Sequence, residues 1–158
     1  MSGRCCFFIG HRDASQEILP ALDEAIEKHI IEYGVTEFIV GSYGNFDLLA
    51  ASAVIRAKQR HPQITLALLL PYHPAERPVE KPGGFDSTYY LEGMENVPRR
   101  FAIVRANRYA VDRADYLIAY VCHPASNARN LTEYAKRREQ KGLISVTLLE
   151  KCGKRACQ

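Results

Sequence analysis

The chain has no hydrophobic run long enough to cross a membrane. A membrane-spanning helix needs about 20 consecutive apolar residues, and no apolar run in these 158 residues approaches that length. Residues 1–6 lead directly into a short strand-like segment. They lack the long apolar region and the small-residue cleavage site of a secretory signal. We therefore expect a cytoplasmic protein without a membrane partner.

The chain also lacks a strong charge of either sign. Its 21 Lys and Arg residues against 18 Asp and Glu residues give a net charge of +3. This excess is too small to indicate a nucleic-acid partner by itself. There is no internal repeat and no low-complexity segment. We expect one domain over residues 1–149, followed by a basic, cysteine-containing tail over residues 150–158.

The chain has five cysteines, an odd number that cannot all pair with one another. At this length a domain does not need disulfide bonds for its stability. Cys5, Cys6 and Cys122 fall in predicted buried strands, where a free thiol behaves as a small hydrophobic group. This pattern favours a reducing compartment. Cys152 and Cys157 frame the basic tail, but a structural zinc site needs four ligands. We therefore expect an unstructured tail rather than metal or redox chemistry there.

Apolar runs alternate with amphipathic helical patterns along the chain. The predicted strands cover residues 5–9, 37–40, 64–70, 116–121 and 143–149, and the predicted helices cover residues 16–33, 46–60, 98–113 and 127–141. Ser15 is the expected N-cap of the first helix and Gly34 its expected C-cap. Continuous apolar strands joined by helices predict a single Rossmann-like α/β/α domain of three layers, with a mainly parallel sheet of five or more strands.

One segment departs from this alternation. Residues 71–97 contain Pro71, Pro74, Pro78 and Pro82 and the pair of glycines at 83–84. A connection of this length inside a compact domain is usually a functional loop or a mobile one. The sequence therefore predicts a long irregular loop here, next to the end of the third strand.

A stretch of small residues follows the second predicted strand. Gly41, Ser42 and Gly44 allow an anion to approach the backbone closely, because large side chains would block it. They precede a predicted helix, whose first N–H groups have no partner within the helix. Asp47 lies in the first turn, where a carboxylate can cap N–H groups or accept a ribose hydroxyl. The stretch predicts a phosphate or nucleotide site.

Other candidates follow the remaining strands, because ligands of an open α/β sheet lie beyond the carboxyl ends of its strands. The full set of predicted binding residues is Gly10, His11, Arg12, Gly41, Ser42, Gly44, Asp47, Tyr72, Asn107, Arg108, Asp112, Ser126 and Asn127. Arg12 can donate two hydrogen bonds to a phosphate, and Tyr72 can stack on a base or sugar. Polar loops and turn glycines also occur at strand ends that bind no ligand. For His11 the two interpretations, contact with a ligand and a local cap, are equally open.

Histidines also follow three of the strands, namely His11, His73 and His123. No carboxylate or cysteine spacing accompanies them, so we expect no metal ion. No other cofactor is expected either.

Two helices contribute further candidates. Arg108 and Asp112 are four residues apart and can simply pair on one helix face, yet Asn107 and Arg108 can also line the cleft. In the helix after the fourth strand, Glu133 is the candidate catalytic carboxylate, as a general acid or base. The alternative for Glu133 is that it only complements the positive start of the helix.

Four stretches together resemble one superfamily. They are FIGHR (8–12), GSYGNFDLLAA (41–51), NRYAVD (107–112) and ADYLIAY (114–120). They are similar to the SLOG superfamily, which groups the DprA/Smf proteins and the "lonely guy" phosphoribohydrolases on a Rossmann-like fold. Within it, the chain most resembles the YpsA-like, DUF1273-type branch. The resemblance covers roughly residues 4–148 and implies a nucleotide or nucleotide-derived ligand at the strand ends.

The phosphoribohydrolase branch implies one alternative, cleavage of a nucleoside monophosphate to base and ribose phosphate. Its motif is Pro-Gly-Gly-x-Gly-Thr-x-x-Glu, and residues 124–133 here read PASNARNLTE. Glu133 falls on the catalytic glutamate, but none of the motif's glycines is kept. Arg108 does not align with that branch's arginine without a gap. We therefore expect a sensor or binding module, with an N-glycosidic hydrolase as the alternative.

The resemblance also bears on the partners of the protein. The DprA relatives raise single-stranded DNA binding as a further alternative, supported by the arginines between residues 99 and 113 and by the basic tail. The mild net charge speaks against it, so we expect a small molecule rather than nucleic acid. Relatives pair through helices that flank the sheet, so we expect a homodimer.

Overall fold

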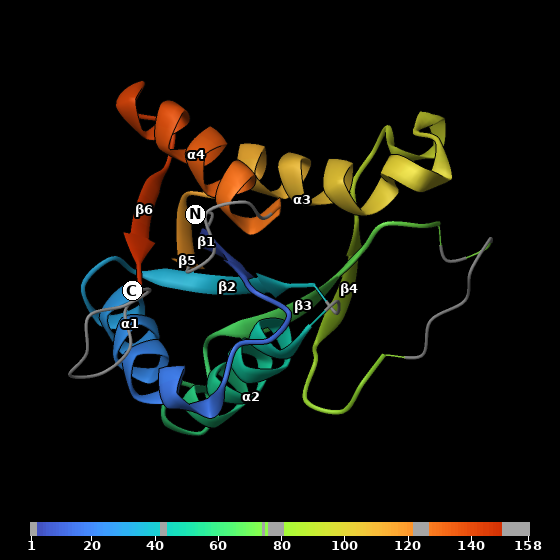
Figure 1. Cartoon of the computed structure of the whole chain (residues 1–158). Helices are drawn as coiled ribbons and strands as arrows, with labels where there is room; N and C mark the ends of the chain where they lie inside the picture. The colour runs from blue at the N-terminus through green and yellow to red at the C-terminus, as the bar shows by residue number, and fades with distance from the viewer. Residues whose placement is uncertain (1–2, 42–43, 74, 76–80, 122–126, 150–158) are drawn as a thin grey trace.

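The computed structural model describes residues 3–41, 44–73, 75, 81–121 and 127–149 (Figure 1). Its strands are β1 (Arg4–Gly10), β2 (Val35–Val40), β3 (Thr65–Leu70), β4 (Ser87–Tyr90), β5 (Tyr116–Tyr120) and β6 (Ser145–Leu148). Its α-helices are α1 (Leu19–Ile31), α2 (Asn45–Arg60), α3 (Ala102–Arg113) and α4 (Asn127–Gln140). Its short 3-10 helices are η1 (Gln16–Ile18), η2 (Met94–Asn96) and η3 (Arg99–Phe101).

The strands form one six-stranded sheet in the order β4-β3-β2-β1-β5-β6, and every neighbouring pair is parallel. Helices α1 and α2 cover one face, and α3 and α4 cover the other (Figure 1). Because the order turns back at β1, the two halves wind outward from this strand. The predicted three-layer Rossmann-like fold is confirmed.

The core lies in two layers because successive side chains of a strand point to opposite faces. Phe8 and Phe38 are buried under α1 and α2, with ring centroids 5.8 Å apart. Phe7, Ile39 and Leu117 are buried under α3 and α4. The continuous apolar runs predicted strands with helices on both faces. Their side chains therefore form both layers of the core.

The prediction of an irregular loop over residues 71–97 was wrong, because this segment contains β4 and η2. Strand β4 lies at the edge of the sheet, and its side chains are exposed or half-buried. An edge strand needs no apolar run, so the hydrophobic pattern on which the strand predictions rested gives no signal here. Pairing with β3 is what selects the strand.

Asp86, directly before β4, forms hydrogen bonds with Leu66 of β3. Its backbone N–H donates to the Leu66 carbonyl at 2.8 Å, and its carboxylate accepts from the Leu66 N–H at 2.8 Å. The Lys58 ammonium, on α2, donates to the same carboxylate at 2.7 Å. Edge strand and helix are thereby joined at one side chain.

Replacing Asp86 by alanine should lower the free energy of unfolding by about 1–3 kcal/mol, since the Leu66 N–H loses its acceptor. Asp86→Asn is the matched control, because it keeps an acceptor oxygen and removes only the charge that attracts Lys58. Urea unfolding of both variants measures the difference. Equal losses for alanine and asparagine would contradict a role for the Leu66 hydrogen bond.

Of the two caps predicted for the first helix, the N-cap is confirmed and the C-cap is wrong. The Ser15 Oγ accepts a hydrogen bond from the Glu17 N–H at 3.3 Å, which confirms the N-cap, although the first turn is 3-10. The C-cap is Glu32 and not Gly34. Gly34 has a φ of 72° and turns the chain into β2, a left-handed conformation that suits glycine.

The cysteine predictions can be checked only in β1. Cys6 is fully buried and Cys5 largely so, and both are free thiols. Burial, with smaller contributions from Glu37 and Asp115, raises the pKa of Cys5 to about 12, which favours the protonated thiol at neutral pH. Cys122, Cys152 and Cys157 lie outside the described residues.

The described residues form neither a membrane-spanning helix nor a cluster of metal-binding side chains. None of the helices there has the length and apolarity that a membrane crossing requires. No group of three or more His, Cys, Asp or Glu side chains in that part of the chain is placed to hold a metal ion.

Candidate functional site

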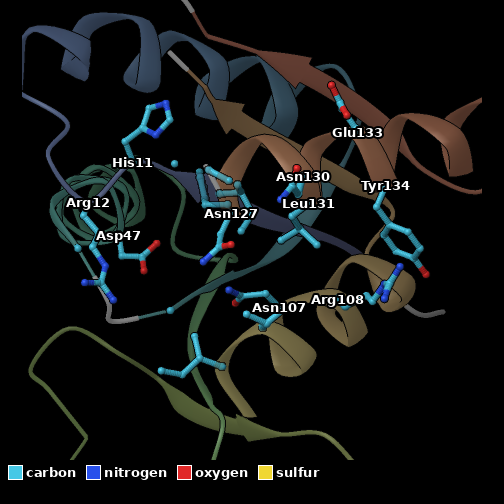
Figure 2. Close-up of a pocket in the computed structure, with 18 of the residues that line it drawn as sticks. His11, Arg12, Asp47, Asn107, Arg108, Asn127, Asn130, Leu131, Glu133 and Tyr134 are labelled. Atoms are coloured by element: carbon cyan, nitrogen blue, oxygen red, sulfur yellow. The ribbon is translucent and has the colours of Figure 1, made fainter. Parts of the chain in front are cut away.

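A cavity of about 810 Å³ opens beyond the carboxyl ends of β1 and β2. The loop after β1 and the start of α2 form one side of it, and the facing surfaces of α3 and α4 form the other (Figure 2). Its position is the one expected for a ligand site in an open parallel sheet. Its volume lies in the upper part of the range of roughly 300–1,000 Å³ that is usual for ligand pockets.

Most of the predicted site residues line this cavity. They are Gly10, His11, Arg12, Gly41, Gly44, Asp47, Asn107, Arg108, Asn127 and the candidate catalytic residue Glu133. Tyr72 and Asp112 are described but are not part of the lining. Ser42 and Ser126, like His123, lie outside the described residues.

The structure adds lining residues that were not among the predicted binding residues. They are Phe8, Ile9, Asp13, Ile103, Val104, Ala128, Asn130, Leu131, Tyr134 and Arg137. Those from α4 recur every three or four residues, so they share one helix face. The spacing is visible in the sequence, but a largely polar helix face usually contacts solvent. Only the packing of α4 beside α3 turns this face into a cavity wall.

Gly10 has a packing role beyond any ligand contact. A Cβ atom at this position would lie 2.1 Å from the ring of Phe46, which is 1% exposed. The Phe46 ring also stacks on Tyr120, with centroids 6.2 Å apart. The end of β1 thus has to be glycine so that the first turn of α2 can sit against the sheet.

Gly44 allows a second close approach. A Cβ atom there would lie 2.6 Å from the Cα of Arg12, so the loop after β1 and the start of α2 cross almost in contact. Gly44 has an extended backbone with a φ of 175°, which any residue can adopt. The lack of a side chain, and not backbone freedom, is therefore what this position requires.

The start of α2 is less open to an anion than the sequence suggested. The Asn45 N–H donates to the Arg12 carbonyl at 2.8 Å, and the Phe46 N–H donates to the His11 carbonyl at 3.3 Å. These two N–H groups of the first turn are therefore already satisfied within the protein. Neither of these two N–H groups is therefore open to an anion, and the nearest cationic side chain of the lining is that of Arg12.

His11 is held inside the cavity wall. Its side chain is 6% exposed, and its ring meets the Tyr120 ring edge-on with centroids 5.8 Å apart. Its carbonyl also accepts from the Ala14 N–H at 3.3 Å. The local-cap interpretation therefore applies to the His11 backbone, and the residue is also part of the cavity lining.

The expected pairing of Arg108 with Asp112 is not the arrangement that the structure shows. Asp112 accepts a hydrogen bond from the Tyr134 hydroxyl at 2.5 Å, and its carboxylate lies 3.4 Å from the Arg138 guanidinium. Arg108 instead lies over the Tyr134 ring, 4.3 Å from its centroid. Burial and the hydrogen bond to Asp112 raise the pKa of Tyr134. Partners on α4 therefore decide the roles of both residues.

Glu133 has an environment that does not single it out for catalysis. Its carboxylate accepts from the Arg129 guanidinium at 3.0 Å, and its side chain is 51% exposed. In Figure 2 it points away from Asn107 and Asn127, which lie in the middle of the cavity. A general acid or base has to reach the reacting atoms, so Glu133 would have to leave Arg129 first.

Tyr72 is engaged elsewhere. The Arg99 guanidinium lies over its ring, 5.5 Å from the centroid. This cation–π contact takes place away from the cavity lining. Stacking of Tyr72 on a ligand inside the cavity is therefore not what this geometry favours.

Comparison with known proteins supports the fold. No protein-family model matches the chain. UPF0398 protein BH1768 from Halalkalibacterium halodurans is 27% identical over 140 residues, which cover 81% of this chain and 74% of that protein. DNA processing protein A (DprA) from Streptococcus pneumoniae matches with a TM-score of 0.65 at 15% identity, over 92% of this chain and 50% of that one.

A second DprA structure agrees. The protein from Helicobacter pylori, reported for its single-stranded DNA binding mode, matches with a TM-score of 0.60 at 14% identity, over 99% of this chain and 69% of that one. The chain therefore has the same Rossmann-like fold as DprA and is distantly similar to the UPF0398 protein. It spans about half the length of the S. pneumoniae protein. The YpsA-like, DUF1273-type assignment stays a prediction.

Proposed function

We propose that the protein binds a nucleotide or a nucleotide-derived small molecule in this cavity, as a sensor or binding module. The observation that carries the proposal is the mixed lining of the cavity at the carboxyl ends of the strands. Arg12 supplies a guanidinium for phosphate, and Asn107 and Asn127 supply amides that can both donate and accept. Ile103 and Leu131 supply apolar surface for a base or sugar.

A binding role is favoured over hydrolysis by the state of Glu133. Its carboxylate is bound to Arg129, and it points away from the amides of the cavity. Glu133 could catalyse the cleavage of an N-glycosidic bond only if its carboxylate reached the reacting atoms of the substrate. Release of free base from a bound monophosphate, abolished by Glu133→Gln, would replace the binding module by the hydrolase.

Single-stranded DNA is the second candidate ligand. The H. pylori relative in fold was studied for this activity. On the present chain, Phe101 is 47% exposed and the Arg100 guanidinium lies 4.9 Å from its ring centroid. Exposed aromatic rings beside cations are typical of surfaces that stack bases. An oligonucleotide therefore belongs in the ligand panel.

The test is thermal unfolding of the protein with nucleoside mono-, di- and triphosphates, NAD, ADP-ribose, ribose 5-phosphate and a single-stranded oligonucleotide. A ligand at about 100 times its dissociation constant should stabilise the protein by about 2.7 kcal/mol. Arg12→Gln should weaken binding about tenfold or more, because a charge-assisted hydrogen bond to phosphate is lost.

Arg105→Gln is the matched control for this variant. Arg105 is an exposed arginine on α3 that lies outside the cavity lining, with its guanidinium 5.9 Å from the Tyr109 ring centroid. Its loss should leave small-molecule binding unchanged. If no member of the panel stabilises the protein, or if Arg12→Gln binds as well as wild type, the proposed site is wrong.

A further inference from the structure

The cavity has a second cationic end, on its α3–α4 wall. The Arg108 guanidinium lies 4.3 Å from the centroid of the Tyr134 ring, and the Arg137 guanidinium lies 6.0 Å from the same centroid. All three residues line the cavity. One aromatic ring therefore holds two arginines from different helices against the same space.

Neither arginine is neutralised by a carboxylate among the residues that the structure describes. The carboxylate of Asp112, one turn beyond Arg108, is taken by Arg138 and by the Tyr134 hydroxyl. The contact described for Arg137 is with the ring of Tyr134. Two like charges held near one ring repel each other, and a bound anion would relieve that repulsion.

The two cationic ends lie on opposite sides of the cavity. Figure 2 shows Arg12 on one side and Arg108 with Tyr134 on the other, and Asn107 and Asn127 lie between them. The space between the ends is thus lined by amides, which suit a sugar or a base edge. The cavity volume of about 810 Å³ leaves room for more than one small anion.

We propose that the ligand carries two phosphate groups separated by a nucleoside, as in a 5′-phosphorylated dinucleotide. This inference rests on the proposed function. One phosphate binds at Arg12, and the second binds between Arg108 and Arg137. Asn107 and Asn127 contact the nucleoside between them. Tyr134 acts by orienting the Arg108 guanidinium, and its own hydroxyl is fixed by Asp112.

The test compares 5′-phosphorylated dinucleotides of each base with the matching nucleoside monophosphates by calorimetric titration. The dinucleotide should bind at least about tenfold more tightly, because the second phosphate adds charge-assisted hydrogen bonds. Arg108→Gln and Arg137→Gln should each remove most of that advantage and weaken monophosphate binding by a smaller factor. Arg105→Gln should keep the full advantage.

Each contrary outcome has a distinct meaning. Equal affinity for dinucleotide and monophosphate, or equal weakening of both by Arg108→Gln and Arg137→Gln, would overturn the second subsite while the proposed function stands. Affinity that keeps rising as the strand is lengthened beyond two nucleotides would also overturn it, in favour of single-stranded nucleic acid. The two arginines lie on different helices. If one variant fails to fold, the dinucleotide affinity of the other variant still tests the second subsite. Melting temperatures without ligand identify such a defect.

Discussion

Replacing Phe46 by alanine should lower the free energy of unfolding by about 3–5 kcal/mol, the usual effect of deleting a buried aromatic side chain. Phe46 is 1% exposed and lies between Gly10 and the Tyr120 ring. Its ring joins the first turn of α2 to the ends of β1 and β5, so its loss leaves a cavity directly beneath the candidate site. Urea unfolding monitored by circular dichroism measures the effect.

A double-mutant cycle shows whether Gly10 and Phe46 act together. Gly10→Ala alone should destabilise by about 1–3 kcal/mol, because the new methyl group overlaps the Phe46 ring. In the Phe46→Ala background the same methyl group enters empty space, so this loss should largely disappear. Leu48→Ala is the control on the same helix, since Leu48 is 66% exposed. Additive losses in the double variant would contradict the contact.

Mild acid should destabilise the protein through His29. The His29 Nδ1 donates to the Ala25 carbonyl at 2.7 Å, and its Nε2 is buried without a hydrogen-bond partner among the described residues. Protonation would place a charged N–H there without an acceptor. Burial, with a smaller contribution from Lys28, lowers the pKa of His29 below its ordinary value of 6.5 despite the opposing effect of the Ala25 hydrogen bond.

The sign of the pH effect follows from linkage. Between pH 6.5 and the lower folded pKa, the unfolded chain binds the proton and the folded protein does not. The stability that neutral His29 contributes is therefore present above pH 6.5 and decreases as the pH falls through this window, by at most about 1.4 kcal/mol per pH unit. The pKa values of Glu27 and Asp86 are also lowered, but from 4.5 and 3.8, so these groups act at lower pH.

Urea unfolding at pH 7.5 and pH 5.5 tests this expectation. Wild type should be less stable at pH 5.5, and His29→Phe should show a smaller difference between the two values, because the titrating group is removed and the ring contacts with Tyr33 and Tyr116 are kept. His73→Gln, at an exposed position, should retain the wild-type difference. An unchanged pH dependence in His29→Phe would show that another group is responsible.

Much of the fold was predictable because its central strands are buried on both faces. Strand β5 and the runs ending at Val40 and Leu70 are continuous apolar segments, and such segments occur where helices cover both sides of a parallel sheet. Strand β4 was missed because it is an edge strand with exposed side chains. Its formation depends on hydrogen bonds to β3, which leave no hydrophobic pattern in the chain.

The candidate site was predictable in part for a related reason. Residues that directly follow a buried strand, such as Arg12 and Gly41, lie at the cavity wherever the sheet is parallel. Tyr134 and Arg137 were missed because they lie far along a helix. Their contribution depends on how α4 packs beside α3.

The sequence by itself determined the layers of this protein and the end of the sheet where its cavity lies, because hydrophobic periodicity and strand direction are local properties of the chain. Only the tertiary structure decided the roles of single residues. It assigned Gly10 to the Phe46 ring, Asp112 to Arg138 rather than Arg108, and the first N–H groups of α2 to the loop after β1. Such assignments depend on distances of a few ångströms between segments far apart in the chain, and these distances are set by packing.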